Sequence, residues 1–432
     1  MARIKIAYIG GGSTRAPGTI ASFIEQGNNF QGSEIVLIDL NMDRLQIVQT
    51  IGEKMAGVRD LDLTISIASD RRAGLEDCDA VLTSYRPGEF EARHLDESIP
   101  LKHGVIGQET QGPGGFFMAL RSVHVMQGIL EDVQQVAPRA RIFNYTNPVN
   151  ILSEAVTHHH DIPFYSFCEG PFDFAEATAR AADLDPAKLD SVMIGLNHAC
   201  WSVRHLYEGE NVMPLIREAY ERKQHDDSFS ADRLRLLKLA VQMNSIPADY
   251  FRYYYYRDDV VAELQAKPTT RAQDIMAALP DYWQHYHEQA QSANPKLDQS
   301  RSRGGIHELE LAIDAMDAIF NDRGEILPIN MPNQGAMPDF PDDLVVEMRG
   351  LLDRHGATPL IDGPLPRHVV GLVKMLGEYQ ALAAEAAWCG RRWDAIRALA
   401  SNPLVLSIKK AEVIYDEMAA ALKDYLPERL LS

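Results

Sequence analysis

Short apolar runs alternate with helical stretches in the first third of the chain. The stretch "RIKIAYIGGGSTR" predicts a β-strand that ends in a glycine turn, and "TIASFI" predicts the start of a helix soon afterwards. Later apolar runs predict further strands at "EIVLIDL", "LTISIA", "DAVLTSY" and "ARIFNYTNP". Strands that alternate with helices are typical of an α/β fold with a parallel sheet. We therefore predict an α/β domain over residues 1–165.

The remainder of the chain has mostly helical periodicity. The segments that carry it are "FDFAEATARAADL", "SADRLRLLKLAVQM", "TTRAQDIMAAL", "ELELAIDAMDAI" and "VVGLVKMLGEYQALAAEAAWCG". We therefore predict a mainly helical α+β domain over residues 166–432.

The turn after the first strand has the spacing of a dinucleotide-binding motif. Gly10 and Gly12 match its first two glycines, whereas Arg15 occupies the third glycine position. The second strand leads into Asp39, where an acid can bind the ribose of NAD and would repel the 2′-phosphate of NADP. A glycine turn alone is often only a tight turn, but Asp39 favours a Rossmann-type NAD domain. The predicted NAD contacts are Gly10, Gly11, Gly12, Ser13 and Asp39.

Two further side chains are expected near the nicotinamide. Ligands of open α/β sheets bind at the carboxyl ends of the strands. Arg86 follows "DAVLTSY", and Asn147 follows the strand predicted in "ARIFNYTNP". A plain turn residue is an equally good interpretation of Asn147, because Pro148 comes next.

Composition and charge narrow the class of protein. The chain has 432 residues and a formal net charge of −19, which argues against a nucleic-acid partner, because phosphate backbones need a basic surface. Four cysteines are too few for a disulfide scaffold, which favours a reducing compartment. The N-terminal apolar run soon reaches glycines, and no run of about 18 apolar residues follows. We therefore expect a cytoplasmic protein without a membrane partner.

A lone cysteine and a histidine are candidates for a metal site. Cys168 lies in "FCEGPFDF", and His198 lies further along in "GLNHACW". A thiolate and an imidazole are good ligands for a divalent metal, and two protein ligands would leave positions open for a substrate. From these residues alone, a buried structural cysteine and a core histidine are the favoured interpretation.

The chain resembles glycoside hydrolase family 4, the NAD- and metal-dependent glycosidases, from end to end. The matching segments include "KIAYIGGGST", "GVIGQETQGPGGF", "NYTNPVN", "GLNHACW", "IPADYFRYYYY", "RSRGG" and "NMPNQGAMPDFPDDLVVE". This resemblance implies that Cys168 and His198 bind a divalent metal, usually manganese. It also implies that residues 166–432 bind metal and substrate and mediate assembly into a homodimer or homotetramer.

The resemblance further implies an unusual route of hydrolysis, since this family does not use the common pair of carboxylates. NAD takes a hydride from carbon 3 of the sugar, and the metal makes the proton on carbon 2 removable. A base takes that proton, the aglycone leaves by elimination, water adds, and the hydride returns. The motif "IPADYFRYYYY" implies that this base is Tyr250.

Three arginines suggest a phosphorylated sugar. Arg86 and Arg93 occupy the positions of arginines in the phosphosugar branch of the family, and Arg271 in "TTRAQ" matches another arginine on the substrate side. A guanidinium group suits a 6-phosphate because it makes two parallel contacts. The expected substrate is a 6-phosphorylated glycoside, with Asn147 as a further substrate contact. A non-phosphorylated glycoside is the alternative.

The residues after the cysteine depart from the family pattern. Branches for β-linked and α-linked 6-phosphoglucosides have Cys-Asn-x-Pro and Cys-Asp-x-Pro, whereas this chain has Cys168-Glu169-Gly170-Pro171. The rest of the chain is closer to the β branch, so we expect a 6-phospho-β-glucosidase-like enzyme with the anomer open. Glu169 and Glu109 are the two candidates for the acid catalyst.

Two other classes of protein remain open. A lactate- or malate-type NAD-dependent dehydrogenase would share the N-terminal half, with Arg86 and His198 as its substrate clamp and base. Such an enzyme would accumulate NADH in bulk, whereas the glycosidase regenerates NAD. A non-catalytic NAD-binding regulator would show no activity on any glycoside after metal addition.

Overall fold

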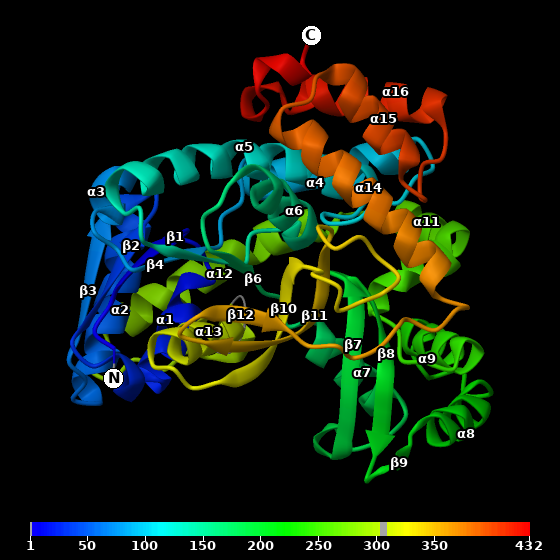
Figure 1. The fold of residues 1–432 in the computed structure, drawn as a ribbon, viewed down its shortest axis with the longest axis horizontal. Helices are drawn as coiled ribbons and strands as arrows, with labels where there is room; N and C mark the ends of the chain where they lie inside the picture. Colours follow the sequence, from blue (N-terminus) through cyan, green and yellow to red (C-terminus); the bar gives the residue numbers. More distant parts are fainter. Residues whose placement is uncertain (1, 303–308) are drawn as a thin grey trace.

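One mixed β-sheet runs through the computed structural model, which describes residues 2–302 and 309–432 (Figure 1). Its strands are β1 (Lys5–Ile9), β2 (Ser33–Ile38), β3 (Leu63–Ala68), β4 (Ala80–Thr83), β5 (Arg141–Asn144), β6 (Phe164–Ser166), β7 (Leu189–Leu196), β8 (Ala199–Tyr207), β9 (Glu210–Asn211), β10 (Glu325–Pro332), β11 (Val345–Asp353) and β12 (Gly356–Pro359). Across the sheet the order is β3-β2-β1-β4-β5-β6-β10-β11-β7-β8-β9, and β12 pairs with β11.

The α-helices cover the sheet and extend from one end of it (Figure 1). They are α1 (Ala16–Glu25), α2 (Met42–Val58), α3 (Arg71–Leu75), α4 (Glu89–Lys102), α5 (Gly112–Val136), α6 (Val149–His159), α7 (Gly170–Ala181), α8 (Met213–Lys223), α9 (Ala231–Met243), α10 (Arg252–Tyr255), α11 (Arg257–Ala266), α12 (Arg271–Gln291), α13 (Glu310–Phe320), α14 (Val370–Trp388), α15 (Arg392–Ser401) and α16 (Ile408–Ala421). Each of the five helical segments expected in the second half of the chain is therefore present.

The first six strands form a parallel half-sheet. β1 pairs with β2 and β4, β2 with β3, β4 with β5, and β5 with β6, and every one of these pairings is parallel. The resulting order 3-2-1-4-5-6 is that of a doubly wound dinucleotide-binding fold. The predicted Rossmann-type architecture is confirmed.

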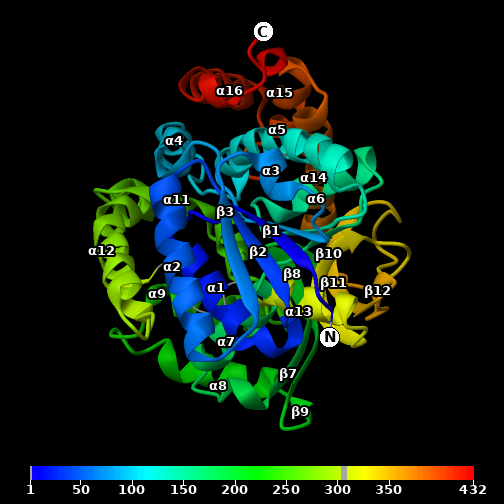
Figure 2. The same ribbon diagram turned by 90° about the vertical axis from the view of Figure 1, so that its left-hand side faces the viewer.

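Alternate residues of the parallel strands enter two separate cores. In β1, Ile6 and Tyr8 belong to one core, together with residues of α1 and α2. Ala7 and Ile9 belong to the other core, together with residues of α5, α6 and α14. Figure 2 shows these helices on opposite sides of the strands. Because both faces are buried, the strands have continuous apolar sequences rather than alternating ones.

The second half of the chain continues the same sheet in an antiparallel manner. β10 pairs with β6 through Asn330 and Ser166, and β11 pairs with both β10 and β7. Helices α7 and α9 pack on each other beside β7, and α14 crosses α5 and α6 (Figure 1). A mainly helical α+β second half is confirmed. The division at residue 165 stays a prediction, since β6 lies at that point and pairs with strands on both sides.

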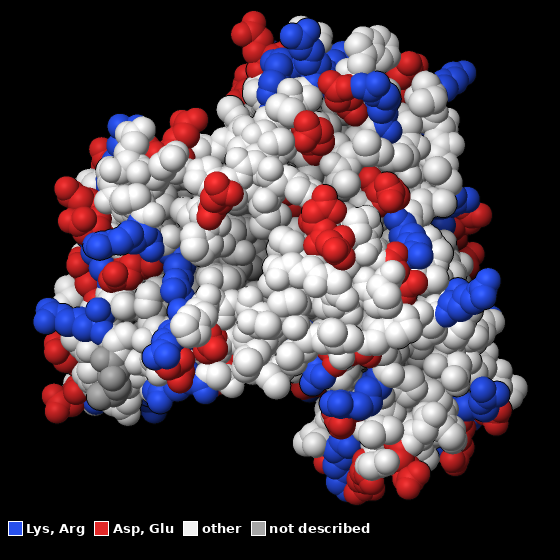
Figure 3. Space-filling model, viewed as in Figure 1, with Lys and Arg blue, Asp and Glu red and all other residues white. Residues whose placement is uncertain are grey.

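The surface carries both signs of charge. On the face shown in Figure 3, acidic and basic side chains are interspersed around the rim, and the middle is mostly uncharged apart from a few acidic side chains. Within the described ranges no helix is long and apolar enough to cross a membrane.

Candidate active site

The glycine turn after β1 leaves no room for a Cβ atom at Gly10 or Gly12. Gly10 has a φ of +97°, and a Cβ there would lie 2.1 Å from the carbonyl oxygen of Ser84. The N–H of Gly12 donates to Oδ2 of Asp39 over 3.0 Å. A Cβ on Gly12 would lie 2.8 Å from Cγ of the same aspartate. The acid at the end of the second predicted strand therefore lies directly against the turn.

The rest of the turn leaves polar groups for a ligand. The N–H of Gly11 donates to the carbonyl oxygen of Ile38 over 3.1 Å, which holds the turn on β2. Oγ of Ser13 is buried, and no described residue provides a hydrogen-bond partner for it. Helix α1 begins just beyond, and no side chain caps its N-terminus. A helix N-terminus beside an unpaired hydroxyl suits the phosphates of a dinucleotide.

Cys168 and His198 lie side by side. Their Sγ and Nε2 atoms are 3.5 Å apart. Cys168 lies between β6 and α7, and the N–H of Gly170 donates to its sulfur over 3.4 Å. His198 lies in the tight turn between β7 and β8, with a φ of +62°. The structure therefore brings together the two residues expected as metal ligands.

Burial sets the charge state of this pair. It lowers the pKa of His198 to about 4, so the imidazole is neutral near pH 7 and keeps a lone pair. Burial also raises the pKa of the Cys168 thiol, which a bound cation would reverse. In the described parts of the chain, no group of three or more His, Cys, Asp and Glu side chains is placed so that it could hold a metal ion. A metal on this pair would keep open coordination positions.

Tyr250 packs directly on the histidine. Its ring lies parallel to the His198 imidazole, with centroids 4.0 Å apart and an interplanar angle of 5°. Phe174 meets both rings edge-on. Burial raises the pKa of Tyr250, and the nearby carboxylate of Glu109 adds to the shift. The tyrosine expected as the base is thus part of the same cluster.

Two of the three arginines converge on one carboxylate. Nη1 of Arg86 and Nη1 of Arg93 lie 2.5 Å and 3.0 Å from Oε2 of Glu109. Nε of Arg93 also donates to Oε1 of Glu97 over 2.7 Å. Two cations on one carboxylate stabilise its charged form, which is unfavourable for a proton donor. Glu97 and Glu109 offset both positive charges, so an anionic ligand would bind these guanidinium groups in place of Glu109.

Arg271 is more distant from this cluster. It is the first residue of α12, and its side chain is exposed. The start of α12 is connected to the arginine cluster through the backbone. The N–H of the next residue, Ala272, donates to Oε2 of Glu97 over 2.8 Å. Arg86 and Arg93 therefore contact the same carboxylate with their side chains, whereas Arg271 is linked to this cluster only through the backbone of its neighbour Ala272.

Asn147 lies just beyond β5, at the carboxyl end of the parallel strands. Its backbone oxygen accepts a hydrogen bond from Oγ of Ser122 over 3.0 Å. Its side-chain Oδ1 is buried and has no hydrogen-bond partner among the described residues. A buried acceptor without a partner suits a ligand hydroxyl or amide.

Glu169 follows Cys168 and is hydrogen-bonded to two other segments of the chain. Oη of Tyr145 donates to its Oε1 over 2.6 Å, and the backbone of Leu311 in α13 also hydrogen-bonds to it. Burial raises the pKa of Glu169 to about 8. This carboxyl group can hold a proton at neutral pH, and its hydrogen bonds are to Tyr145 and to the backbone of α13.

Several polar residues behind the site were not predicted from the sequence. Glu347 is 1% exposed, and its Oε1 accepts hydrogen bonds from Nδ2 of Asn197 over 2.9 Å and from Nδ2 of Asn330 over 3.0 Å. Thr110 hydrogen-bonds to the other nitrogen of His198. The lone acid in the apolar run "LVVEM" was a usable signal for Glu347, whereas Thr110 gave none beyond its place in "IGQET".

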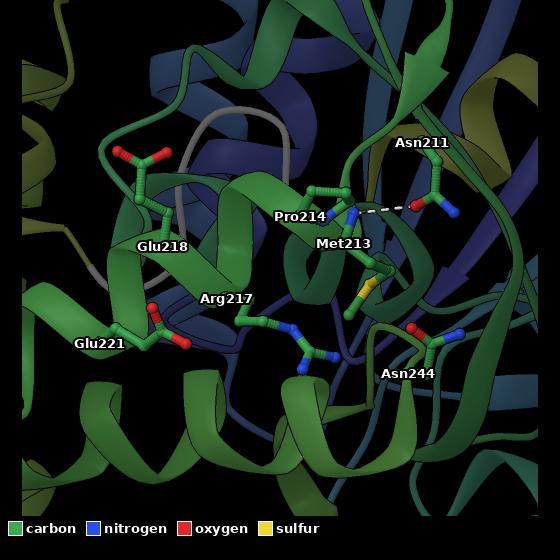
Figure 4. A pocket seen from close by; sticks show the side chains of 7 residues that line it. All are labelled: Asn211, Met213, Pro214, Arg217, Glu218, Glu221 and Asn244. Carbon is green, nitrogen blue, oxygen red and sulfur yellow. Dashed lines mark hydrogen bonds between the residues drawn. The ribbon is translucent and has the colours of Figure 1, made fainter.

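Two surface hollows lie away from these residues. One has a volume of about 290 Å³ and is formed by the start of α8 and the end of α9, with Arg217 pointing into it (Figure 4). The other has a volume of about 820 Å³ and lies between β8 and the segment before α14. Neither is lined by any residue expected in the active site.

Comparison with known proteins decides the family. Residues 5–184 match the family model described as family 4 glycosyl hydrolase, and residues 193–405 match that of its C-terminal domain. The chain belongs to the family 4 glycosyl hydrolases. Both halves of this glycosyl hydrolase therefore match the same family, in agreement with the resemblance noted from the sequence.

Relatives of this glycosyl hydrolase match over nearly their whole length. A probable 6-phospho-β-glucosidase of Bacillus subtilis (strain 168) is 33% identical, with 98% of each chain covered. A 6-phospho-β-glucosidase of Escherichia coli (strain K12) is 31% identical, with 98% of this chain and 96% of the relative covered. A solved 6-phospho-α-glucosidase from gut microorganisms, in complex with NAD and Mn²⁺, is 26% identical with a TM-score of 0.87, covering 99% of this chain and 100% of that one.

Proposed function

We propose that this family 4 glycosyl hydrolase cleaves a 6-phosphorylated glycoside, using NAD and a divalent metal, most suitably Mn²⁺. The observation that carries the proposal is the cluster in which Cys168, His198 and Tyr250 are in mutual proximity, with Sγ and Nε2 separated by 3.5 Å. The three relatives described above are all 6-phosphoglucosidases by name, which supports the substrate class.

The donor set fits a metal ion. A thiol sulfur and a neutral imidazole nitrogen face each other, and His198 is 6% exposed. Cys168 and His198 would hold the ion, and the open positions would accept sugar oxygens. Sugar oxygens are ligands that suit manganese, and the thiolate and the imidazole would be the protein's own ligands to the divalent cation.

The glycine turn fits a dinucleotide. The close approach of Gly12 to Asp39 and the unpaired hydroxyl of Ser13 are the observations that support it. Gly10, Gly11, Gly12 and Ser13 would hold the pyrophosphate, and Asp39 would bind the ribose. When bound, NAD supplies a reversible hydride acceptor and the metal supplies a Lewis acid.

Tyr250 is the proposed base for the proton on carbon 2 of the sugar. Its ring is fixed by stacking on His198 and by the edge of Phe174, so its hydroxyl is held in one place relative to the metal ligands. Positioned general bases contribute roughly 10²–10⁴-fold to the rate. Glu169 is the better of the two candidates for the acid, because Glu109 is bound to two arginines.

Arg86 and Arg93 are the proposed binding groups for the 6-phosphate. Arg93 is 7% exposed and lies in α4, where Glu97 holds it in place. A second candidate substrate, a non-phosphorylated glycoside, has no observation in its favour. We further propose the β-anomer, because two relatives at 33% and 31% identity are named as a probable 6-phospho-β-glucosidase and a 6-phospho-β-glucosidase. A homodimer or homotetramer and a cytoplasmic location stay predictions.

The test is a screen of nitrophenyl glucosides and galactosides, in α and β forms, with and without a 6-phosphate. The enzyme is assayed with NAD, Mn²⁺ and a thiol reductant, and bulk NADH is followed at the same time. We expect nitrophenol release from a 6-phospho-β-glycoside without net NADH. Release only from unphosphorylated sugars would contradict the substrate class, and NADH accumulation without release would support a dehydrogenase instead.

A further inference from the structure

His198 uses its two ring nitrogens for two different contacts. Nε2 faces Sγ of Cys168 at 3.5 Å, and Nδ1 lies 3.0 Å from Oγ1 of Thr110. A neutral imidazole carries its proton on only one of these nitrogens, and only the other nitrogen has a lone pair that can bind a metal. The position of that proton therefore decides whether Nε2 can act as a ligand.

Gln108 determines the direction of the hydrogen bonds at Thr110. The side-chain Oε1 of Gln108 accepts hydrogen bonds from the backbone N–H of Thr110 over 2.5 Å and from the backbone N–H of Gln111 over 2.8 Å. Two backbone donors on one atom identify that atom as the amide oxygen, because an NH₂ group would meet both of them as a donor. Oε1 of Gln108 is therefore an acceptor only.

The hydroxyl of Thr110 lies 2.9 Å from this same oxygen. Its single proton must point at Gln108, because otherwise two oxygen acceptors would meet without a proton between them. The lone pairs of Oγ1 are then left to accept the proton of Nδ1 of His198. The imidazole is held as the Nδ1–H tautomer, with the lone pair of Nε2 directed toward Cys168.

We propose that Thr110 and Gln108 are positioning residues that fix the tautomer and the orientation of His198 for metal binding. This inference rests on the proposed function, in which His198 is a metal ligand. Partners on the far nitrogen of a metal-binding histidine commonly change metal affinity by about 10–100-fold. Thr110 also adjoins Glu109, so the segment that binds Arg86 and Arg93 is the one that orients the metal ligand.

The test measures Mn²⁺ affinity and the tautomer separately from catalysis. Full-length wild type, Thr110→Val, Thr110→Ser and His198→Ala are titrated with MnCl₂ alone, and free Mn²⁺ is followed by electron paramagnetic resonance. We expect Thr110→Val, which keeps the shape and loses the hydroxyl, to bind Mn²⁺ about 10–100-fold more weakly. Thr110→Ser should restore the wild-type affinity, and His198→Ala should bind least.

Nitrogen-15 spectra of histidine-labelled protein without metal give the second measurement, with His198→Ala used to assign the signal. Wild type and Thr110→Ser should show His198 as the Nδ1–H tautomer, and Thr110→Val should show a mixture. Gln108→Leu should have the same effect as Thr110→Val, which keeps the test valid if the valine variant fails to fold.

The outcomes separate the inference from the proposed function. If His198→Ala binds Mn²⁺ as tightly as wild type, the metal site itself is wrong. If binding depends on His198 while Thr110→Val and Gln108→Leu keep wild-type affinity, the positioning role is overturned. A wild-type Nε2–H tautomer would overturn it as well.

Discussion

The glycine turn and the cluster of proposed metal ligands, Cys168 and His198, differ in how much of the chain builds them. Gly10, Gly12 and Asp39 follow two consecutive strands, β1 and β2, and hydrogen bonds from the backbone N–H groups of the turn and close contacts hold them. The Cys168–His198 cluster draws on four segments that are distant in sequence and includes side chains from Thr110 and Tyr250. A local motif can be recognised from spacing, whereas an assembled site depends on the order of the strands.

The strongest way to separate the two regions is to remove one of the proposed metal ligands. Cys168→Ser and His198→Ala should each abolish glycoside hydrolysis, because each removes one of only two assigned protein ligands. NAD affinity should stay near that of wild type, since neither side chain contacts the glycine turn. Turnover assays and fluorescence titration with NAD provide the check. Wild-type turnover in either variant would contradict the metal site.

Removal of a buried arginine should have the next largest effect. Arg93→Ala loses a charged contact to the proposed 6-phosphate, worth about 2–5 kcal/mol when the group is desolvated. The Michaelis constant for a 6-phosphoglycoside should rise strongly, while the variant keeps a native circular dichroism spectrum. Arg271→Ala is the matched control with an exposed side chain, and its effect should be smaller. Equal effects of the two variants would mean that Arg93 does not bind the phosphate preferentially.

A substitution in the glycine turn should weaken NAD binding and leave Mn²⁺ affinity unchanged. Gly10→Ala places a Cβ 2.1 Å from the carbonyl oxygen of Ser84 at a φ of +97°. Strain of this kind costs about 1–3 kcal/mol, so urea unfolding should show a lower free energy of unfolding and NAD should bind more weakly. Gly371→Ala is the control, because its Cβ would meet nothing within 4 Å in α14. Mn²⁺ affinity that fell as far as NAD affinity would contradict the independence of the two regions.

The smallest effect is expected for a substitution at Glu347, which lies behind the proposed metal ligands. Glu347→Ala leaves the amides of Asn197 and Asn330 without their buried acceptor, at a cost of about 1–3 kcal/mol in the free energy of unfolding. Glu325→Ala, on the exposed end of β10, should change stability by less than about 0.5 kcal/mol. Urea denaturation of both variants measures the difference. No difference between them would mean that the buried carboxylate does not stabilise the site.

Much of the fold could be predicted from the sequence because its first half obeys local rules. Parallel strands buried on both faces gave continuous apolar runs, and the helices gave clear periodicity. The antiparallel strands of the second half were harder to predict. β11 is buried along most of its length and contains Glu347, so it shows neither a clean alternation nor an uninterrupted apolar run.

The metal-ligand cluster could not be predicted from spacing. Ser166, Asn330, Glu347 and Gly195 are paired in one row across β6, β10, β11 and β7, and this row brings the segments of Cys168 and His198 together. No local pattern encodes that strand order, so the family resemblance was the only basis for the pair. The sequence also could not indicate that Glu169 would form hydrogen bonds with Tyr145 and with the backbone of α13.

The central claim is that hydrolysis removes the proton from carbon 2 of the sugar with Tyr250 as the base. The most direct test is wild-type turnover of a 6-phospho-β-glycoside in heavy water, followed by mass and proton spectra of the released sugar phosphate. The account predicts deuterium at carbon 2 of the product, and a turnover in Tyr250→Phe that is lower by roughly 10²–10⁴-fold. A product that keeps its original hydrogen at carbon 2 in full would contradict the account.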